Sequence, residues 1–143
     1  MSFSLAIWTA IAILGLIYLA ACKPQPIEER AGETITAKAA YVIDGDTFYL
    51  EGHRTRIRLW GINAPEMAQE GGNASKSYLT TLIQNKRLRC HLRGKDRHNR
   101  FVALCALPDG TDIAAAMIEA GHAKEHRRYS KGYYRHIGPS RKQ

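Results

Sequence analysis

The chain has 143 residues, with 21 Lys and Arg against 13 Asp and Glu, and therefore a formal net charge of +8. Its 45% hydrophobic and 24% charged residues exclude a disordered or collagen-like chain, and its length excludes a large multidomain enzyme. The positive charge favours a polyanionic partner, such as nucleic acid or an anionic membrane surface; a basic surface with no specific partner is the alternative.

The first 22 residues contain no charged side chain. An apolar run of about 20 residues matches the thickness of a bilayer core, so residues 1–22 are predicted to be an export signal or a membrane anchor outside the folded domain. The run ends in Leu19-Ala-Ala-Cys22, which resembles the bacterial lipobox with Cys22 as the lipidation site. Because no Lys or Arg precedes the run, an uncleaved anchor is an alternative, and a buried core helix is a third. Residues 23–34 carry two prolines and mixed charges, which predicts a linker.

Residues 35–130 are predicted to form one domain that begins with strands. Residues 34–43 and 47–50 are rich in strand-forming side chains and are separated by the turn Asp44-Gly45-Asp46. In residues 54–60, Arg side chains alternate with apolar ones, which predicts a barrel strand with Ile57 and Leu59 inside.

The second half of the domain is predicted to contain two helices and two further strands. Residues 73–85 place apolar side chains at helical spacing, and residues 113–120 form a second helix that Asp112 caps and Gly121 ends. Between them lie two strands joined by the turn-like segment 94–99. This order predicts an α+β, mainly β fold: a five-stranded, OB-like barrel with two helices, preceded by the N-terminal hydrophobic helix or signal.

Cys90 and Cys105 lie in the two strands of the predicted hairpin, which brings them close together. In an oxidising compartment such a pair forms a disulfide; two small, buried apolar side chains are the alternative. No Cys-x-x-Cys spacing is present, and the histidines do not cluster with the cysteines, so structural zinc is not expected.

The C-terminal segment from Lys124 to Gln143 holds seven Lys or Arg and one acid, Glu125. Tyr129 lies beside Arg127 and Arg128 in this segment, and aromatic side chains among cations suit single-stranded nucleic acid. Residues 131–143 are predicted to be a basic tail, for which a solvated, frayed end is the alternative.

Three short segments combine the residue types that phosphodiester hydrolysis requires. They place carboxylates at Asp44, Asp46 and Glu66, with arginines at 58 and 100. A hard divalent cation needs oxygen ligands, the attacking water needs a base or a positioning carboxylate, and the charge that develops on phosphorus needs fixed cations. Asp96 is expected to shape the hairpin before Arg100 and to take no part in the chemistry.

These segments, Ile43–Thr47, Arg58–Glu66 and Asp96–Arg100, resemble the staphylococcal-nuclease (thermonuclease) family, in its exported bacterial type. The resemblance covers about residues 40–129 and continues through Ala120-Gly-His-Ala123. It implies a Ca²⁺-dependent endonuclease that hydrolyses DNA, RNA or both with little sequence specificity. With the apolar N-terminus, it implies a monomer in the cell envelope, anchored to the membrane and facing the periplasm or the exterior.

The resemblance also implies roles for individual residues. Arg58 and Arg100 are expected to bind the phosphate and stabilise the transition state, and Glu66 to orient or deprotonate the attacking water. Asp46, Asn63 and the backbone carbonyl of Ala64 are the expected Ca²⁺ ligands. Asp44 is expected in the outer shell of the metal.

Two features depart from the family pattern. Asn63 stands where the family has a second metal-binding Asp, which removes one negative charge from the site. The chain also ends shortly after Gly138-Pro139, which disfavours the family's long C-terminal helix. The alternative function is therefore a catalytically weak or inactive nucleic-acid-binding module tethered to the membrane. A third candidate is a structural envelope protein whose basic tail binds anionic lipid.

Overall fold

The computed structural model describes residues 32–138, and the predicted signal or anchor with Cys22 lies outside these residues. Five strands form a closed barrel in the order β1-β2-β3-β6-β5. Their bounds are β1 Thr34–Val42, β2 Thr47–Leu50, β3 Ile57–Leu59, β5 Arg87–Lys95 and β6 Phe101–Ala106. All pairs are antiparallel except β3 with β6, which run parallel. The predicted five-stranded barrel is confirmed.

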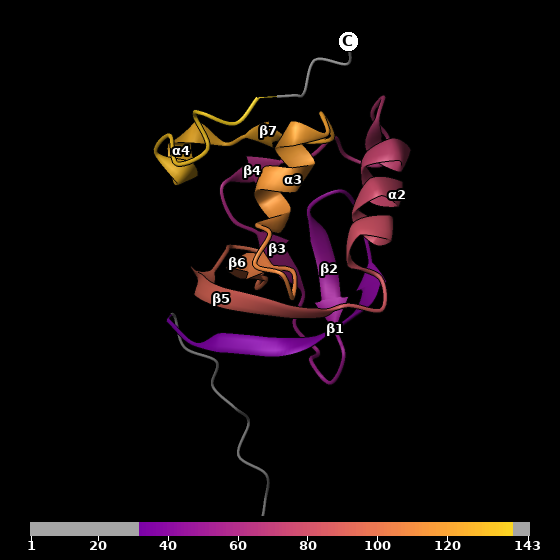
Figure 1. The fold of residues 1–143 in the computed structure, drawn as a ribbon, viewed down its shortest axis with the longest axis vertical. Helices are drawn as coiled ribbons and strands as arrows, with labels where there is room; N and C mark the ends of the chain where they lie inside the picture. The colour runs from indigo at the N-terminus through magenta and orange to yellow at the C-terminus, as the bar shows by residue number, and fades with distance from the viewer. Residues whose placement is uncertain (1–31, 139–143) are drawn as a thin grey trace, which may run out of the picture.

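Two short strands and three helices complete the fold of residues 32–138. Strands β4 (Ile62–Asn63) and β7 (Lys124–Glu125) pair as a separate two-stranded sheet. In Figure 1, helix α3 (Ile113–Glu119) lies between α2 (Gly72–Ile83) and the short α4 (Arg127–Ser130). The sequence predicts α2 and α3 but not the single turn of α4. Within residues 32–138, no helix has the length and apolar character needed to cross a membrane.

The alternation of strand residues explains the barrel interior. Alternate side chains along the strands point inward and are almost completely buried; they include Phe48, Ile57, Leu59, Leu88 and Leu92. They pack with Leu79 and Ile83 of α2 and with Ile113 and Met117 of α3. Burial of this continuous apolar surface, at roughly 25 cal/mol per Å², is the main stabilising term of the domain.

The strand predicted for residues 54–60 is wrong at its beginning, since β3 spans only Ile57–Leu59. Its partner β2 has four residues, and only Thr47 and Phe48 pair with β3. The preceding turn includes Gly52 at a φ of 79°, a left-handed conformation that glycine adopts without steric cost. Residues 54–56 therefore belong to the connection and not to the sheet.

The helix caps follow the sequence prediction. The side chain of Asp112 accepts hydrogen bonds from the backbone N–H groups of Ala114 (2.8 Å) and Ala115 (3.2 Å) at the start of α3. Gly121, at a φ of 75°, follows the end of α3, and its N–H donates to the Ile118 carbonyl. These bonds satisfy terminal backbone groups that a helix cannot pair internally.

The segment after α4 packs against the barrel. Tyr134 is buried, its hydroxyl donates to Asp112 Oδ2 at 3.0 Å, and its backbone N–H donates to Glu125 Oε1. Burial and the nearby Asp112 carboxylate raise the pKa of Tyr134, which stays protonated. Gly61 leaves room for this ring, since a Cβ at Gly61 would lie 2.9 Å from Tyr134 Cε2. Within residues 32–138, this packing places the segment that follows α4 over Gly61.

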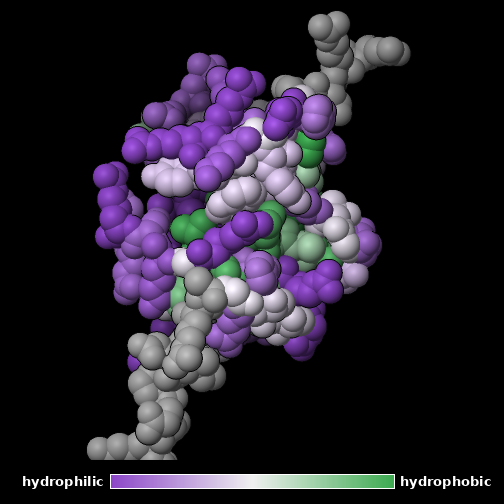
Figure 2. Space-filling model, turned by 90° about the vertical axis from the view of Figure 1, so that its left-hand side faces the viewer, coloured by the Kyte–Doolittle hydropathy of each residue, from purple (hydrophilic) through white to green (hydrophobic). Residues whose placement is uncertain are grey.

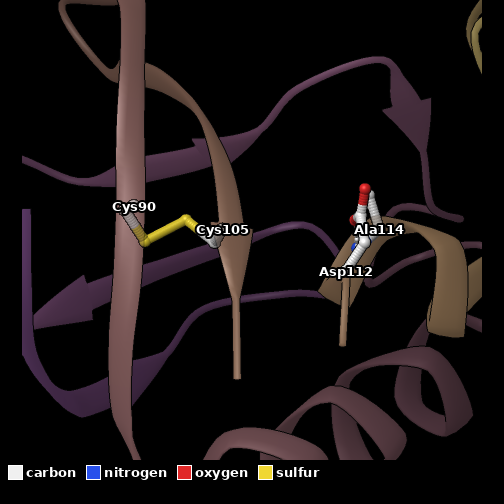
Figure 3. The surroundings of a disulfide bond; sticks show 4 residues. All are labelled: Cys90, Cys105, Asp112 and Ala114. Carbon is white, nitrogen blue, oxygen red and sulfur yellow. Dashed lines mark hydrogen bonds between the residues drawn. A yellow bond between two sulfur atoms is a disulfide. The ribbon is translucent and has the colours of Figure 1, made fainter. Parts of the chain in front are cut away.

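A disulfide joins Cys90 on β5 to Cys105 on β6, at directly opposed positions of the two strands (Figure 3). Both residues are buried among the core side chains. The hairpin therefore brings Cys90 and Cys105 together as a disulfide, and not as two buried reduced thiols.

The disulfide is expected to contribute about 3 kcal/mol to the free energy of unfolding, because it closes a loop of 15 residues in the unfolded chain. Denaturant unfolding of the oxidised and reduced protein measures this difference. The Cys90→Ala/Cys105→Ala variant, compared with the reduced wild type, separates the loss of the cross-link from the loss of the sulfur atoms. Equal free energies for the oxidised and reduced forms would contradict the expectation.

Candidate functional site

The site lies where the β1–β2 turn meets the segment from β3 to α2. Gly45 in this turn packs so closely that a Cβ there would lie 2.0 Å from Ser75 Oγ and 2.6 Å from the Ala64 Cβ. The Ser75 hydroxyl is itself fixed by donating to the His122 carbonyl at 2.7 Å. Only glycine therefore lets the turn approach α2 at this distance, which positions the two flanking aspartates.

Asp46 is the buried centre of the site, with 6% of its surface exposed. Its Oδ2 accepts from the Ala64 N–H at 3.0 Å and pairs with Arg58 Nη1 at 3.0 Å, while its Oδ1 accepts from the Thr47 hydroxyl. Burial raises the pKa of Asp46 to about 6, because the Arg58 charge and the Ala64 N–H only partly replace lost hydration. A further cation at this carboxylate would favour its ionised form.

Arg58 connects Asp46 to Asn63. Its Nη2 donates to Asn63 Oδ1 at 2.9 Å, and its Nη1 also donates to the Leu59 carbonyl. The guanidinium is therefore bonded to two of the oxygens that the family resemblance implies as metal ligands. Cation binding at these oxygens would therefore compete with Arg58.

Arg100 reaches the same network from the start of β6. Asp96 holds it through two bonds of 2.8 Å, from Arg100 Nε and Nη2 to Asp96 Oδ2, and Arg100 Nη1 donates to Thr47 Oγ1 at 3.2 Å. Burial opposes ionisation of Asp96, but the Arg100 backbone N–H and guanidinium outweigh it and hold the pKa of Asp96 below its usual value. Asp96 thus positions Arg100, in addition to shaping the hairpin through its bond from the His98 N–H.

The structure brings together six of the predicted site residues and leaves the others apart. Asp46, Arg58, Asn63, Ala64 and Arg100 form one hydrogen-bonded network through Thr47. Asp44 joins it through its Oδ1, which accepts from the Asp46 N–H at 3.0 Å. Glu66 lies three residues beyond Asn63 in the same segment, is exposed, and bonds through its backbone N–H to Gln69 Oε1.

The predicted nucleic-acid-binding residues lie on a neighbouring surface. Arg127 and Arg128 line a cleft of about 540 Å³ together with Asn63 and Ala64. Tyr129 is 62% exposed and packs edge-on against His126, with ring centroids 4.7 Å apart. This cleft therefore extends from the Asn63 segment toward α4.

Sequence reasoning missed Thr47 and Gly45 as site-building residues. Thr47 is 1% exposed, and its hydroxyl links Asp46 to Arg100, so it couples the carboxylate to the second arginine. The sequence feature that could have identified Thr47 is its position directly after Asp46, at the start of a predicted strand.

The donor set fits a hard divalent cation. Within residues 32–138, no three His, Cys, Asp or Glu side chains form a group suited to a metal. The candidate ligands are instead one buried carboxylate, one amide oxygen and one backbone carbonyl, with Asp44 beside them. All are oxygen donors, the type that Ca²⁺ prefers.

Comparison with known proteins places the chain in a family. The family model described as "Staphylococcal nuclease homologue" matches residues 56–142. A succinoglycan biosynthesis protein, ExoI, of Rhizobium meliloti is 36% identical over 115 residues, which cover 73% of this chain and 59% of that protein. Uncharacterized endonucleases of Escherichia coli O157:H7 and Haemophilus influenzae are 32% and 33% identical, over 67% and 68% of this chain and 64% and 56% of their own lengths. The chain thus spans about three fifths of the length of these relatives.

Proposed function

Because the chain belongs to the staphylococcal nuclease homologue family, we propose that it is a nuclease that hydrolyses phosphodiester bonds with Ca²⁺. Its substrates are DNA, RNA or both, cleaved with little sequence specificity. The observation that carries this proposal is the single network that joins Arg58, Asp46, Thr47 and Arg100. It holds two guanidinium groups beside a buried carboxylate, the combination that phosphoryl-transfer chemistry uses.

The two arginines bind and polarise the phosphate. Arg58 lies on β3 and Arg100 directly precedes β6, and both are linked to the Asp46 carboxylate, Arg58 directly and Arg100 through the Thr47 hydroxyl. Asp96 fixes the direction of Arg100. Preorganised guanidinium donors stabilise the negative charge that develops on the phosphoryl oxygens.

Glu66 acts on the attacking water. It is exposed in the segment that follows the metal ligands, where its carboxylate is accessible to solvent and substrate. Gly72 holds this segment close to α2, since a Cβ at Gly72 would lie 2.2 Å from the Glu66 carbonyl oxygen. A carboxylate in this place orients the water and accepts its proton.

Asp46, Asn63 and the Ala64 carbonyl would hold Ca²⁺, with Asp44 in the outer shell. When bound, the cation neutralises charge on the phosphate and aligns it with the attacking water. Arg58 now bonds to Asp46 and Asn63, and its guanidinium would be available to the phosphate if these two oxygens held the cation instead.

The cell envelope is the proposed location, with the domain facing the periplasm or the exterior. The apolar segment 1–22 supports a membrane tether, by lipidation at Cys22 or as an uncleaved anchor. The Cys90–Cys105 disulfide supports an oxidising compartment.

Asn63→Asp is expected to raise Ca²⁺ affinity by about tenfold, because it adds one negative charge at a ligand position. Isothermal titration calorimetry of wild type and variant measures the change. Asn73→Asp is the matched control, because it makes the same substitution at an exposed position at the start of α2. No gain for Asn63→Asp over this control would contradict the proposed ligand set.

Incubation with end-labelled single-stranded DNA and RNA, in Ca²⁺, tests the proposed activity. We expect a ladder of products from cleavage at many positions. Binding of both nucleic acids without cleavage would favour the alternative, an inactive binding module that has lost activity through Asn63.

A further inference from the structure

Strand β5 carries a row of basic side chains on the outer surface of the barrel. Its inward positions, Leu88, Cys90 and Leu92, are buried, while the intervening residues are all exposed. We call these outward residues the β5 row: Arg87, Arg89, His91 and Arg93. Figure 2 views the side on which α4 and the adjoining ends of β5 and β6 lie in Figure 1, and hydrophilic side chains cover much of it around a smaller apolar area. Alternate residues of a strand are about 7 Å apart, so the row presents regularly spaced charges.

None of the β1 and β6 residues that pair with the β5 row is acidic, and Glu33, just before β1, accepts from the Leu92 N–H through its carbonyl. The outward residues of β1 that pair with it are Thr34, Thr36 and Lys38, and those of β6 are uncharged. Within the described part of the chain, the ion pairs of arginine involve Arg58, Arg100 and Arg127, and none involves the row. Such a surface attracts a polyanion.

A hollow of about 460 Å³ adjoins the row and adds an aromatic side chain. Arg89, His91 and Tyr133 all line it, and Tyr133 is 59% exposed. Arg93 lies over the Trp60 ring at 4.6 Å, and Trp60 in turn contacts Tyr133 edge-on, with ring centroids 5.5 Å apart. The acid in the hollow, Asp112, is engaged by α3 and Tyr134, which leaves cations and an exposed ring to meet a ligand. Aromatic rings beside cations stack on the bases of single-stranded nucleic acid, and an anionic lipid surface offers no bases to stack on. The hollow therefore favours single-stranded nucleic acid over lipid.

The β5 row is continuous with the candidate active site across the sheet. Arg58 pairs with Val102, and Val102 pairs with Gly94. Two strand spacings, about 10 Å, therefore separate the backbone at Arg58 from the end of the row beside Gly94. A single-stranded nucleic acid that is bound at Arg58 and Arg100 therefore reaches the β5 row within a few nucleotides.

We propose that the β5 row, with Tyr133, is a second binding surface for the phosphate backbone of single-stranded nucleic acid, outside the site of cleavage. The inference rests on the proposed nuclease function, because the segment that the row holds is the continuation of a strand in the active site. The row binds long substrates without reading sequence, since it contacts phosphates.

Binding of fluorescent single-stranded DNA to the whole chain in detergent, with EDTA present, tests this surface. The test compares strands of about 20 nucleotides with strands of about four. Arg87→Gln/Arg89→Gln is expected to weaken binding of the long strand about 25-fold at 0.1 M salt. It is also expected to make the slope of log affinity against log salt shallower by about 1.4, since two phosphate contacts are lost. Binding of the short strand, which the active site accommodates alone, is expected to change much less.

Arg87→Lys/Arg89→Lys keeps the charge and is expected to retain the salt slope of the wild type. If the arginines had only a structural role, the lysine variant would not restore binding. Arg54→Gln/Lys76→Gln removes two charges outside β5, one before β3 and one on α2, and is the matched control. An unchanged salt slope in Arg87→Gln/Arg89→Gln overturns the inference. The inference is also overturned if Arg87→Gln/Arg89→Gln weakens binding of the chain to anionic relative to zwitterionic vesicles but leaves DNA binding unchanged. Absence of cleavage by the wild type would refute the proposed function but would leave this binding result interpretable.

Discussion

Arg100→Ala is expected to lower kcat/KM for single-stranded DNA about 10³-fold with little change in stability. The residue supplies a guanidinium that Asp96 aims at the network around Asp46, and it is only partly buried. Loss of one preorganised donor to a transition-state oxyanion costs about 10² to 10³ in rate, and loss of a phosphate-binding arginine costs as much or more. Steady-state kinetics in saturating Ca²⁺ measure the effect.

Arg97→Ala is the matched control for this variant. Arg97 lies in the same hairpin, is exposed, and donates only to the His98 ring in the described structure. Because it lies outside the Asp46 network, its loss is expected to leave kcat within about twofold. Equal activities of Arg100→Ala and Arg97→Ala would show that Arg100 does not act on the phosphate.

Glu66→Gln is expected to lower kcat by a factor of about 10² to 10⁴, because the neutral amide of Gln cannot accept a proton from the attacking water. The change keeps the size of the side chain and leaves the backbone bond to Gln69 in place. Ca²⁺ affinity is expected to stay close to that of the wild type, because Glu66 is not among the proposed ligands. Single-turnover cleavage and calorimetry separate the two effects.

The same substitution at Glu119 provides the comparison. Glu119 is exposed at the end of α3, away from the Asn63 segment. A Glu66→Gln variant that cleaves as fast as Glu119→Gln would remove Glu66 from the chemistry. A Glu66→Gln variant that instead loses Ca²⁺ would make Glu66 a metal ligand.

The parts of the fold that depend on local pattern could be predicted from the sequence. Alternation identified Ile57 and Leu59 as inward residues, and the Asp112 and Gly121 signals fixed the ends of α3. Segment order predicted the closed barrel, whose strands the structure confirms. These features depend on neighbours within one or two turns or on strand parity, both of which the sequence displays directly.

The parts that depend on contacts between distant segments could not be predicted. The hydroxyl of Thr47 joins Asp46 to Arg100 across 53 residues of sequence, and Tyr134 becomes buried against Asp112 although it lies in a basic segment. The β5 row needed the pairing of β5 with β1 and β6, since the absence of acids among its strand partners follows from which strands flank it. The short β3 likewise follows from the length of its partner.

The rate of cleavage of single-stranded DNA as a function of Ca²⁺ concentration tests the central claim most directly. We predict a rate that rises to saturation with Ca²⁺, falls to background in EDTA, and is about 10³-fold lower at every Ca²⁺ level in Arg100→Ala. Tight binding of the strand by the wild type with no cleavage at any Ca²⁺ concentration would contradict the account and leave a binding module in its place.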